Sequence, residues 1–220
     1  MAFFYDKNTA ANRIKIKDKK MQDVLWHGRG GQGVVLAAQI LGEAAYIQGF
    51  KGVTSAPTFG PERRGAPVAA STRISDEPIR TFSQIEAADV AVVLDATLLT
   101  MIDIFGRLKD SGMIIVNTPL APDQIGIEGC FDVASVDASG IAREQRLTVG
   151  GFPIVNTPLL GAFAKATGLV SLENIERGLK KKMSGDKVIA NCVAVRTAFE
   201  NTIVTRHDSK TGKSDKKPKK

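Results

Sequence analysis

A glycine-rich turn at residues 27–33 constrains the fold of this chain more than any other feature. Its sequence, His27-Gly-Arg-Gly-Gly-Gln-Gly33, contains the spacing G-x-G-x-x-G. A short apolar run at residues 24–26 precedes the turn, and residues 34–48 carry apolar side chains at helical spacing. The order of strand, glycine turn and helix predicts an α/β fold with an anion-binding loop.

Phosphate is the ligand that this turn suits best. Glycine lacks a side chain, so backbone N–H groups can approach a bound anion closely. The first N–H groups of the following helix have no partner within the helix, and the helix dipole favours negative charge there. Arg29 adds a cation in the same turn. The alternative is a tight connection between strand and helix that binds no ligand.

A dinucleotide site of the common type would need an acidic residue about twenty positions further on, to bind the ribose hydroxyls. The sequence has no Asp or Glu between Glu43 and Glu62. The expected second strand, at residues 52–55, ends in hydroxyl side chains and is followed by Pro57. The missing acid argues against NAD, although a free-standing NAD(P)-binding oxidoreductase remains an alternative.

A second loop, at residues 57–67, carries the adjacent arginines Arg63 and Arg64 between prolines and glycines. Two neighbouring guanidinium groups suit bidentate contacts with phosphate or carboxylate. We therefore predict that this loop contributes to the same anion site. The alternative is that both arginines are solvated surface charges, or that one pairs with Glu62.

The rest of the chain alternates between strand and helix patterns. Mainly apolar runs such as residues 88–94 are typical of parallel strands that are buried on both faces. We predict one α/β domain with a doubly wound, mainly parallel, Rossmann-like sheet and a helical C-terminal cover. Further strands are expected at residues 68–74, 113–116 and 131–136, and helices at 98–108, 139–144, 158–167, 171–183 and 185–204.

Ligands of such sheets bind at the carboxyl ends of the strands. Asp95 and the pair Asn156-Thr157 also suit helix caps, the latter because Pro158 fits a first turn. A cap residue can still line a pocket. The segments that this topology places at one edge of the sheet are residues 28–33, 54–59, 95–97 and 117–118.

The net charge of +7 belongs to the two ends of the chain. Residues 1–20 hold six Lys and Arg against two Asp, and residues 206–220 hold seven against two. Residues 21–205 hold seventeen basic against nineteen acidic residues, too few positive charges to wrap a nucleic acid. We predict a basic N-terminal arm at 1–20, one folded domain at 21–205 and a flexible basic tail at 206–220.

The sequence offers little for catalysis by this chain alone. Cys130 and Cys192 lack C-x-x-C spacing, and no nucleophile–base pair or metal-ligand spacing occurs. His207 lies in the predicted tail, and His27 lies at a strand end, where it contacts a phosphate or simply bonds the backbone. No apolar run approaches the roughly 18 residues that span a bilayer, and no secretory segment is evident, so we predict a cytoplasmic protein without catalytic or metal-binding residues.

The glycine turn and the arginine loop, Phe59-Gly-Pro-Glu-Arg-Arg-Gly-Ala-Pro67, together resemble the gamma subunit of the pyruvate (2-oxoacid):ferredoxin oxidoreductase family. The resemblance covers roughly residues 22–203. It continues in the same order with Val90-Ala-Val-Val-Leu-Asp95, Ile114-Ile-Val-Asn-Thr118, Pro153-Ile-Val-Asn-Thr-Pro158 and Leu160-Gly-Ala-Phe-Ala-Lys-Ala-Thr-Gly168.

This resemblance implies that residues 21–205 are a gamma-type catalytic domain within a multisubunit enzyme. Such an enzyme converts a 2-oxoacid, such as pyruvate or the aryl acid phenylglyoxylate, with coenzyme A to an acyl-CoA and CO2. The implied partners are alpha, beta and ferredoxin-like delta subunits, which hold thiamine diphosphate, Mg and 4Fe-4S clusters, and the electron acceptor is ferredoxin or NAD.

The chain itself is then expected to help bind coenzyme A and to complete the core. The alternative is a structural subunit of a member that does not use coenzyme A, such as an oxalate-acting one. The residues predicted to contact coenzyme A are Gly28, Arg29, Gly30, Gly31, Gln32, Gly33, Arg63 and Arg64. The alternative for Arg63 and Arg64 is that they stabilise the loop facing the thiamine site.

Overall fold

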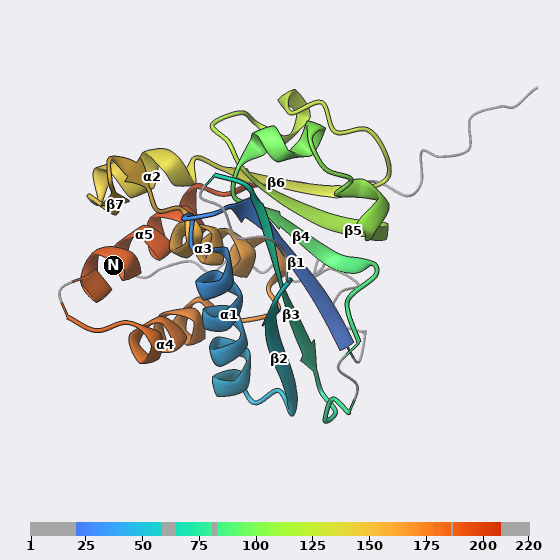
Figure 1. Ribbon diagram of the computed structural model, residues 1–220, viewed down its shortest axis with the longest axis horizontal. Coiled ribbons are helices and arrows are strands. Elements are labelled where there is room, and N and C mark those ends of the chain that lie inside the picture. Colours follow the sequence, from blue (N-terminus) through green and yellow to red (C-terminus); the bar gives the residue numbers. More distant parts are fainter. Residues whose placement is uncertain (1–20, 59–64, 81–82, 186, 208–220) are drawn as a thin grey trace, which may run out of the picture.

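The computed structural model describes residues 21–58, 65–80, 83–185 and 187–207. Within them the chain forms a seven-stranded sheet with helices packed against it (Figure 1). The predicted N-terminal arm, Arg63, Arg64 and the tail from residue 208 onward lie outside the described residues.

The elements follow one another as strand and helix through most of the described chain. The strands are β1 (Met21–Arg29), β2 (Gly52–Pro57), β3 (Pro67–Ser75), β4 (Ala88–Val93), β5 (Leu108–Asn117), β6 (Asp132–Val136), β7 (Thr148–Val149), β8 (Phe152–Pro153) and β9 (Ile203–Thr205). The helices are α1 (Val34–Gln48), α2 (Ala138–Glu144), α3 (Asn156–Thr167), α4 (Leu172–Lys182) and α5 (Lys187–Asn201), with 3-10 turns η3 (Ala96–Thr100), η4 (Phe105–Arg107) and η5 (Pro122–Gln124).

The main sheet has the strand order β2-β3-β1-β4-β5-β6-β9. Strands β1, β4, β5 and β6 are parallel, while β3 runs antiparallel between β1 and β2, and β9 runs antiparallel to β6. From β1 the chain winds outward to β2 through α1, and β4 then begins the other half of the sheet. This order confirms the predicted α/β fold and puts a topological switch point between β1 and β4.

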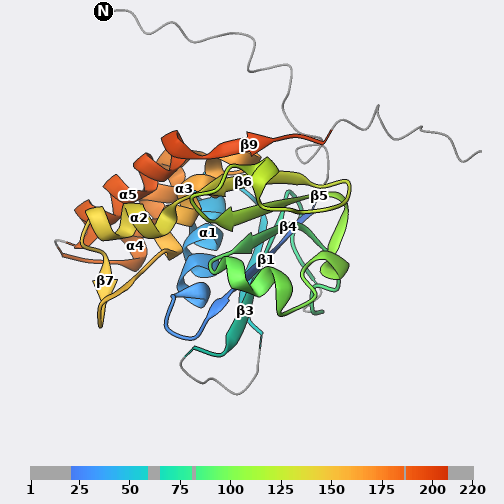
Figure 2. The same cartoon turned by 90° about the horizontal axis from the view of Figure 1, so that it is seen from above.

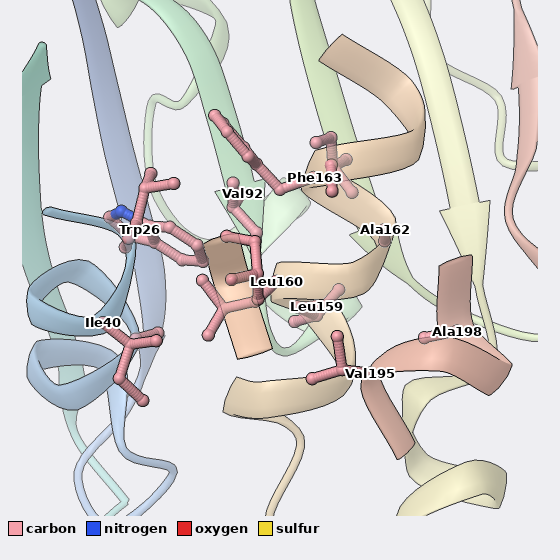
Figure 3. Packing of buried hydrophobic residues seen from close by; sticks show 14 of the residues in the cluster. Trp26, Ile40, Val92, Leu159, Leu160, Ala162, Phe163, Val195 and Ala198 are labelled. Carbon is pink, nitrogen blue, oxygen red and sulfur yellow. The ribbon is translucent and has the colours of Figure 1, made fainter. Parts of the chain in front are cut away.

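The larger part of the core lies between the sheet and helices α1, α3, α4 and α5, which gather on one side of it (Figures 1 and 2). Trp26 from β1 and Phe163 from α3 meet there with ring centroids 6.2 Å apart (Figure 3). The indole N–H of Trp26 donates to the hydroxyl of Thr72 at 3.2 Å, so burying it leaves no unpaired donor. α3 and α5 pack closely because Gly161 faces the backbone of Val195, 2.0 Å from where a Cβ would lie.

The predicted helix at residues 98–108 is wrong. The segment instead forms the 3-10 turns η3 and η4, and β5 already begins at Leu108. Asp103 accepts a hydrogen bond from the backbone N–H of Gly106 at 2.8 Å, a local contact that competes with helix. The apolar spacing was nevertheless informative, because Leu98 and Ile104 are buried against the sheet face opposite the long helices.

Two predicted helices also have different ends. The helix predicted at 185–204 ends at Asn201, and the β-branched residues that follow form β9 at the edge of the sheet. α3 begins at Asn156 rather than at Pro158, so Asn156-Thr157 forms its first turn instead of capping it. Ser171 caps α4, since its hydroxyl accepts from the backbone N–H of Asn174 at 3.2 Å.

The first two residues assigned to the flexible tail are held against the sheet. Arg206 forms an ion pair with Asp132 at 2.9 Å and donates to the carbonyl oxygen of Ala166 at 2.7 Å. The backbone N–H of His207 also donates to Asp132, at 2.9 Å. The described fold therefore extends to residue 207.

Candidate functional site

A cleft of about 1050 Å³ opens at the switch point, beside the carboxyl ends of β1 and β4. Three parts of the chain form its walls: the glycine turn, the first turn of α1 and the hairpin β7–β8. The described lining residues are Arg29, Gly30, Gly31, Gln32, Gly33, Val34, Val35, Leu36, Gln39, Gly65, Val68, Asp95, Ser139, Val149, Phe152, Pro153, Ile154 and Val155.

The glycine turn needs glycine at two positions for its backbone conformation. Gly31 has φ 97° and Gly33 has φ 78°, in the region that side chains disfavour. Gln32 closes the turn by accepting from the backbone N–H of Arg29 at 2.8 Å through its side-chain oxygen. The predicted turn is thus formed, and Gln32 stabilises it from within.

Gly28 has a different role, because it lets the helix approach the strand. A Cβ at this position would lie 2.6 Å from the Cγ2 atom of Val34, which is closer than real contacts allow. Any larger residue would push the start of α1 away from β1. The first turn of α1 therefore stands directly over the end of the strand.

That first turn presents unpaired backbone donors to the cleft. Gly33 occupies the N-cap position without any side-chain cap, and the first backbone bond of the helix runs from Ala37 N to Gly33 O at 3.0 Å. Val34, Val35 and Leu36, whose N–H groups precede that bond, all line the cleft. These donors and the positive end of the helix dipole favour an anion.

Arg29 is the last residue of β1, and its guanidinium is bonded within the protein. The group donates to Asp95 through Nε at 2.7 Å, to Gly65 O at 3.0 Å, and to Thr97 Oγ1 at 2.7 Å. It also contacts the sulfur of Met101 at 3.1 Å. The predicted contact of Arg29 with a phosphate stays a prediction.

Asp95 confirms the expected cap, since it accepts from the backbone N–H of Thr97 at 3.0 Å at the start of η3. Burial acts to raise the pKa of Asp95, but the hydrogen bonds from Thr97 and Arg29 outweigh burial and lower the pKa below its ordinary value. Asp95 is therefore ionised and paired. It is the one acidic residue among the described lining residues.

The opposite wall is apolar. Val149 and Phe152, on the hairpin β7–β8, are 61% and 65% exposed although both side chains are hydrophobic. This wall could not be recognised from the sequence, because strands of two residues are too short to show alternation. The detectable signal was the pair Gly150-Gly151, whose φ values of 58° and 82° suit a two-residue hairpin turn.

The arginine loop rejoins the described chain at Gly65, which lines the cleft. Gly30 N donates to Ala66 O at 2.9 Å, and Gly65 N donates to Gly30 O at 3.2 Å, so the glycine turn pairs with the loop's end. Arg63 and Arg64 lie outside the described residues.

The four segments predicted to share one edge are only partly brought together. Residues 28–33 and 95–97 meet directly through Arg29. The side-chain amide of Asn117 donates to Leu94 O at 2.9 Å and to the hydroxyl of Ser139 at 3.0 Å. Of these three residues, Ser139 lines the cleft. Residues 54–58 are not among the described lining residues, since β3 separates β2 from β1.

His27 points into the protein and does not line the cleft. Its side chain is 3% exposed, and Nε2 has no hydrogen-bond partner among the described residues. Burial, helped by the positive charge of Arg107, lowers the pKa of His27 from 6.5 to about 4. The imidazole is therefore neutral at pH 7.

The described residues contain no group of three or more His, Cys, Asp or Glu side chains placed to hold a metal ion. None of their helices has the length and apolar character needed to cross a membrane.

Comparison with known proteins places this geometry in a family. The family model for pyruvate ferredoxin/flavodoxin oxidoreductase matches residues 23–201. The gamma subunit common to the pyruvate and ketoisovalerate oxidoreductases of Thermococcus litoralis is 48% identical over 188 residues, which cover 84% of this chain and 98% of that protein.

Solved structures show the same fold. The crystal structure of the pyruvate oxidoreductase subunit PORC (EC 1.2.7.1) of Thermotoga maritima superposes with a TM-score of 0.72 at 36% identity, covering 86% of this chain and 100% of that chain. A 2-oxoglutarate:ferredoxin oxidoreductase from Magnetococcus marinus, solved with 2-oxoglutarate, coenzyme A and succinyl-CoA bound, gives a TM-score of 0.65 at 20% identity, over 82% of this chain and 30% of that one, and shares the fold alone. The family match and the near-complete coverage of the gamma subunits show that the chain belongs to the pyruvate ferredoxin/flavodoxin oxidoreductase family, as a gamma-type subunit of a 2-oxoacid:ferredoxin oxidoreductase complex.

Proposed function

We propose that the cleft binds coenzyme A, and that the assembled complex uses it for oxidative decarboxylation of a 2-oxoacid to an acyl-CoA and CO2. The observation that carries this proposal is the pairing of two unlike walls in one cleft. Unpaired N–H groups of α1 lie on one side and the exposed apolar hairpin β7–β8 lies on the other.

Coenzyme A has parts that suit both walls. Its pyrophosphate needs N–H donors, which Gly31 and Gly33 of the glycine turn and the first turn of α1 (Val34, Val35 and Leu36) supply. Its pantetheine chain and adenine ring carry apolar surface that fits against Val149 and Phe152. Arg63 and Arg64 are proposed to bind a phosphate of the same ligand, because their loop ends at Gly65 on the cleft.

The cleft is less suited to a nicotinamide dinucleotide. Such a site uses a free carboxylate to bind ribose hydroxyls. Asp95 is the sole acidic residue among the described lining residues, and both of its oxygens already accept hydrogen bonds from Thr97 and Arg29. This observation favours coenzyme A over the free-standing NAD(P)-dependent alternative.

The proposal leaves the redox chemistry to other subunits of the complex. We propose that alpha, beta and ferredoxin-like delta subunits hold thiamine diphosphate, Mg and 4Fe-4S clusters, and that ferredoxin or NAD accepts the electrons. Pyruvate is the substrate most consistent with the relatives, whose names give pyruvate and ketoisovalerate; an aryl 2-oxoacid such as phenylglyoxylate is the other candidate. The part of this chain is to hold coenzyme A and to complete the core.

The test uses the purified complex with the double variant Arg63→Ala/Arg64→Ala and, separately, Phe152→Ala. Each is expected to raise the KM for coenzyme A about tenfold, because each removes one of the two kinds of contact. Ile189→Ala is the matched control, since Ile189 is 71% exposed on α5 and does not line the cleft. An unchanged KM in intact complexes of both test variants would support a purely structural subunit instead.

A further inference from the structure

We propose that Arg29 is a positioning residue, which fastens the glycine turn to the loops after β4 and before β3 and leaves the phosphate contacts to backbone N–H groups. This inference rests on the proposed binding of coenzyme A. Its basis is that one guanidinium reaches Gly65, Asp95, Thr97 and Met101, which are 36, 66, 68 and 72 positions away in the sequence.

The contacts of Arg29 form a closed set. Thr97 Oγ1 accepts from Arg29 at 2.7 Å and donates to Asp95 Oδ1 at 2.6 Å, while Asp95 Oδ2 accepts from Arg29 Nε at 2.7 Å. Three side chains thereby satisfy one another in a ring. Nε and both terminal nitrogens of Arg29 donate hydrogen bonds, which use four of its five N–H groups, and its charge is balanced by the ionised Asp95.

This ring holds the backbone that faces the ligand. Arg29 immediately precedes Gly30, which pairs with Gly65 and Ala66 through bonds of 3.2 and 2.9 Å. Arg29 itself donates to Gly65 O, so the side chain and the backbone fix the same junction. Glycines at positions 30, 31 and 33 cannot hold the turn rigid by themselves, because glycine has the greatest backbone freedom. The ring supplies the rigidity that converging N–H donors need.

Variants of Thr97 distinguish a positioning role of Arg29 from a direct phosphate contact, because Thr97 is not among the described lining residues of the cleft. Thr97→Val keeps the shape of the side chain and removes the hydroxyl that completes the ring, while Arg29 keeps its charge. Thr97→Ser keeps the hydroxyl and is the conservative control. If Arg29 positions the turn, Thr97→Val has the same effect as a change of Arg29, to a smaller extent.

The experiment measures KM for coenzyme A and kcat in purified complexes that carry Arg29→Lys, Thr97→Val, Thr97→Ser or the double variant Arg29→Lys/Thr97→Val. We expect KM to rise about tenfold for Arg29→Lys and about threefold for Thr97→Val, with kcat within twofold of the unmodified complex. Thr97→Ser should restore the original KM. The double variant should be no worse than Arg29→Lys, since both changes break the same ring.

An unchanged KM for Thr97→Val, or fully multiplicative effects in the double variant, would overturn the positioning role and support a direct phosphate contact. Including Phe152→Ala in the same series distinguishes the two proposals. If Phe152→Ala raises KM and Thr97→Val does not, only the positioning role is lost. If none of the variants, including Arg63→Ala/Arg64→Ala, changes KM, the coenzyme A cleft itself is rejected.

Discussion

The side-chain amide of Asn156 donates a hydrogen bond to the carbonyl oxygen of Gly33 at 3.3 Å and joins the starts of two helices that lie 123 positions apart in the sequence. Gly33 is the N-cap of α1 and Asn156 is the first residue of α3. A Cβ on Gly33 would lie 2.4 Å from the Asn156 nitrogen. The position of the donors at the cleft thus depends on this contact.

Gly33→Ala is expected to lower the free energy of unfolding by about 2 to 3 kcal/mol, because it combines a strained backbone at φ 78° with the displacement of Asn156. Denaturant unfolding of the full-length chain measures this loss. Gly31→Ala is the control: its φ of 97° is also strained, but a Cβ there has no neighbour within 4 Å, so its loss should be smaller. Equal losses of stability in the two variants would show that the Asn156 side chain moves aside without lowering the free energy of unfolding.

Phe163→Ala should cost about 3 to 5 kcal/mol of stability, since it removes a ring that is 0% exposed and stacks on Trp26. Phe152→Ala is the matched control. It removes the same ring from a side chain that is 65% exposed, and it should cost less than about 1 kcal/mol. Thermal unfolding of both full-length variants tests the difference, and similar costs would contradict the described packing.

Thr157→Val should destabilise the contact between α3 and α5 by about 1 to 3 kcal/mol. The buried Thr157 hydroxyl donates to Asn191 Oδ1 at 2.6 Å, and the valine would leave that oxygen buried without a donor. Thr157→Ser retains the donor and loses a methyl group, so it should cost about 1 kcal/mol. Chemical denaturation of the three proteins compares them. A serine variant less stable than the valine variant would count against the bond.

His27 should make the protein less stable in mild acid. Its pKa is 6.5 when exposed and about 4 when folded, so between these values the unfolded chain binds a proton that the folded chain does not. The free energy of unfolding therefore falls as the pH drops from about 6.5 to 4 and is unaffected by His27 above that range.

His27→Phe removes this contribution and keeps an aromatic ring at the buried site. Between pH 7 and pH 4.5 the stability difference between the two proteins should shift in favour of the variant by about 2 kcal/mol, which follows from the size of the pKa shift. Urea unfolding at both pH values gives that difference. A constant difference would mean that the imidazole can bind a proton in the folded state.

Regular elements with clear ends could be predicted from the sequence. Helix α1 runs from Val34 to Gln48 as expected, because Gly33 and Gly49 both adopt left-handed conformations at its ends. The fully buried strand β4 was evident from its apolar run, which only Asp89 interrupts. By contrast, the 3-10 turns and β9 share their apolar spacing with helices, and only packing against the sheet decides between the two.

Of the candidate site, the glycine turn could be predicted in the same way, because glycine spacing is a local property of the chain. The hairpin wall could not be predicted, because nothing near Phe152 in the sequence indicates that the fold brings this residue close to the start of α1. The bonding of Arg29 was hidden for the same reason, since Asp95 is 66 positions away.

The two faces of the sheet are covered unequally, and this gives the subunit one rigid and one adaptable side. Helices such as α1 and α3 form a backbone hydrogen bond at nearly every residue, whereas turns of three to five residues such as η3 and η4 form very few backbone hydrogen bonds. Deuterium from solvent should therefore enter the layer over β4 and β5 long before it reaches the helical layer. The short turns are where this subunit can change shape while its core stays closed.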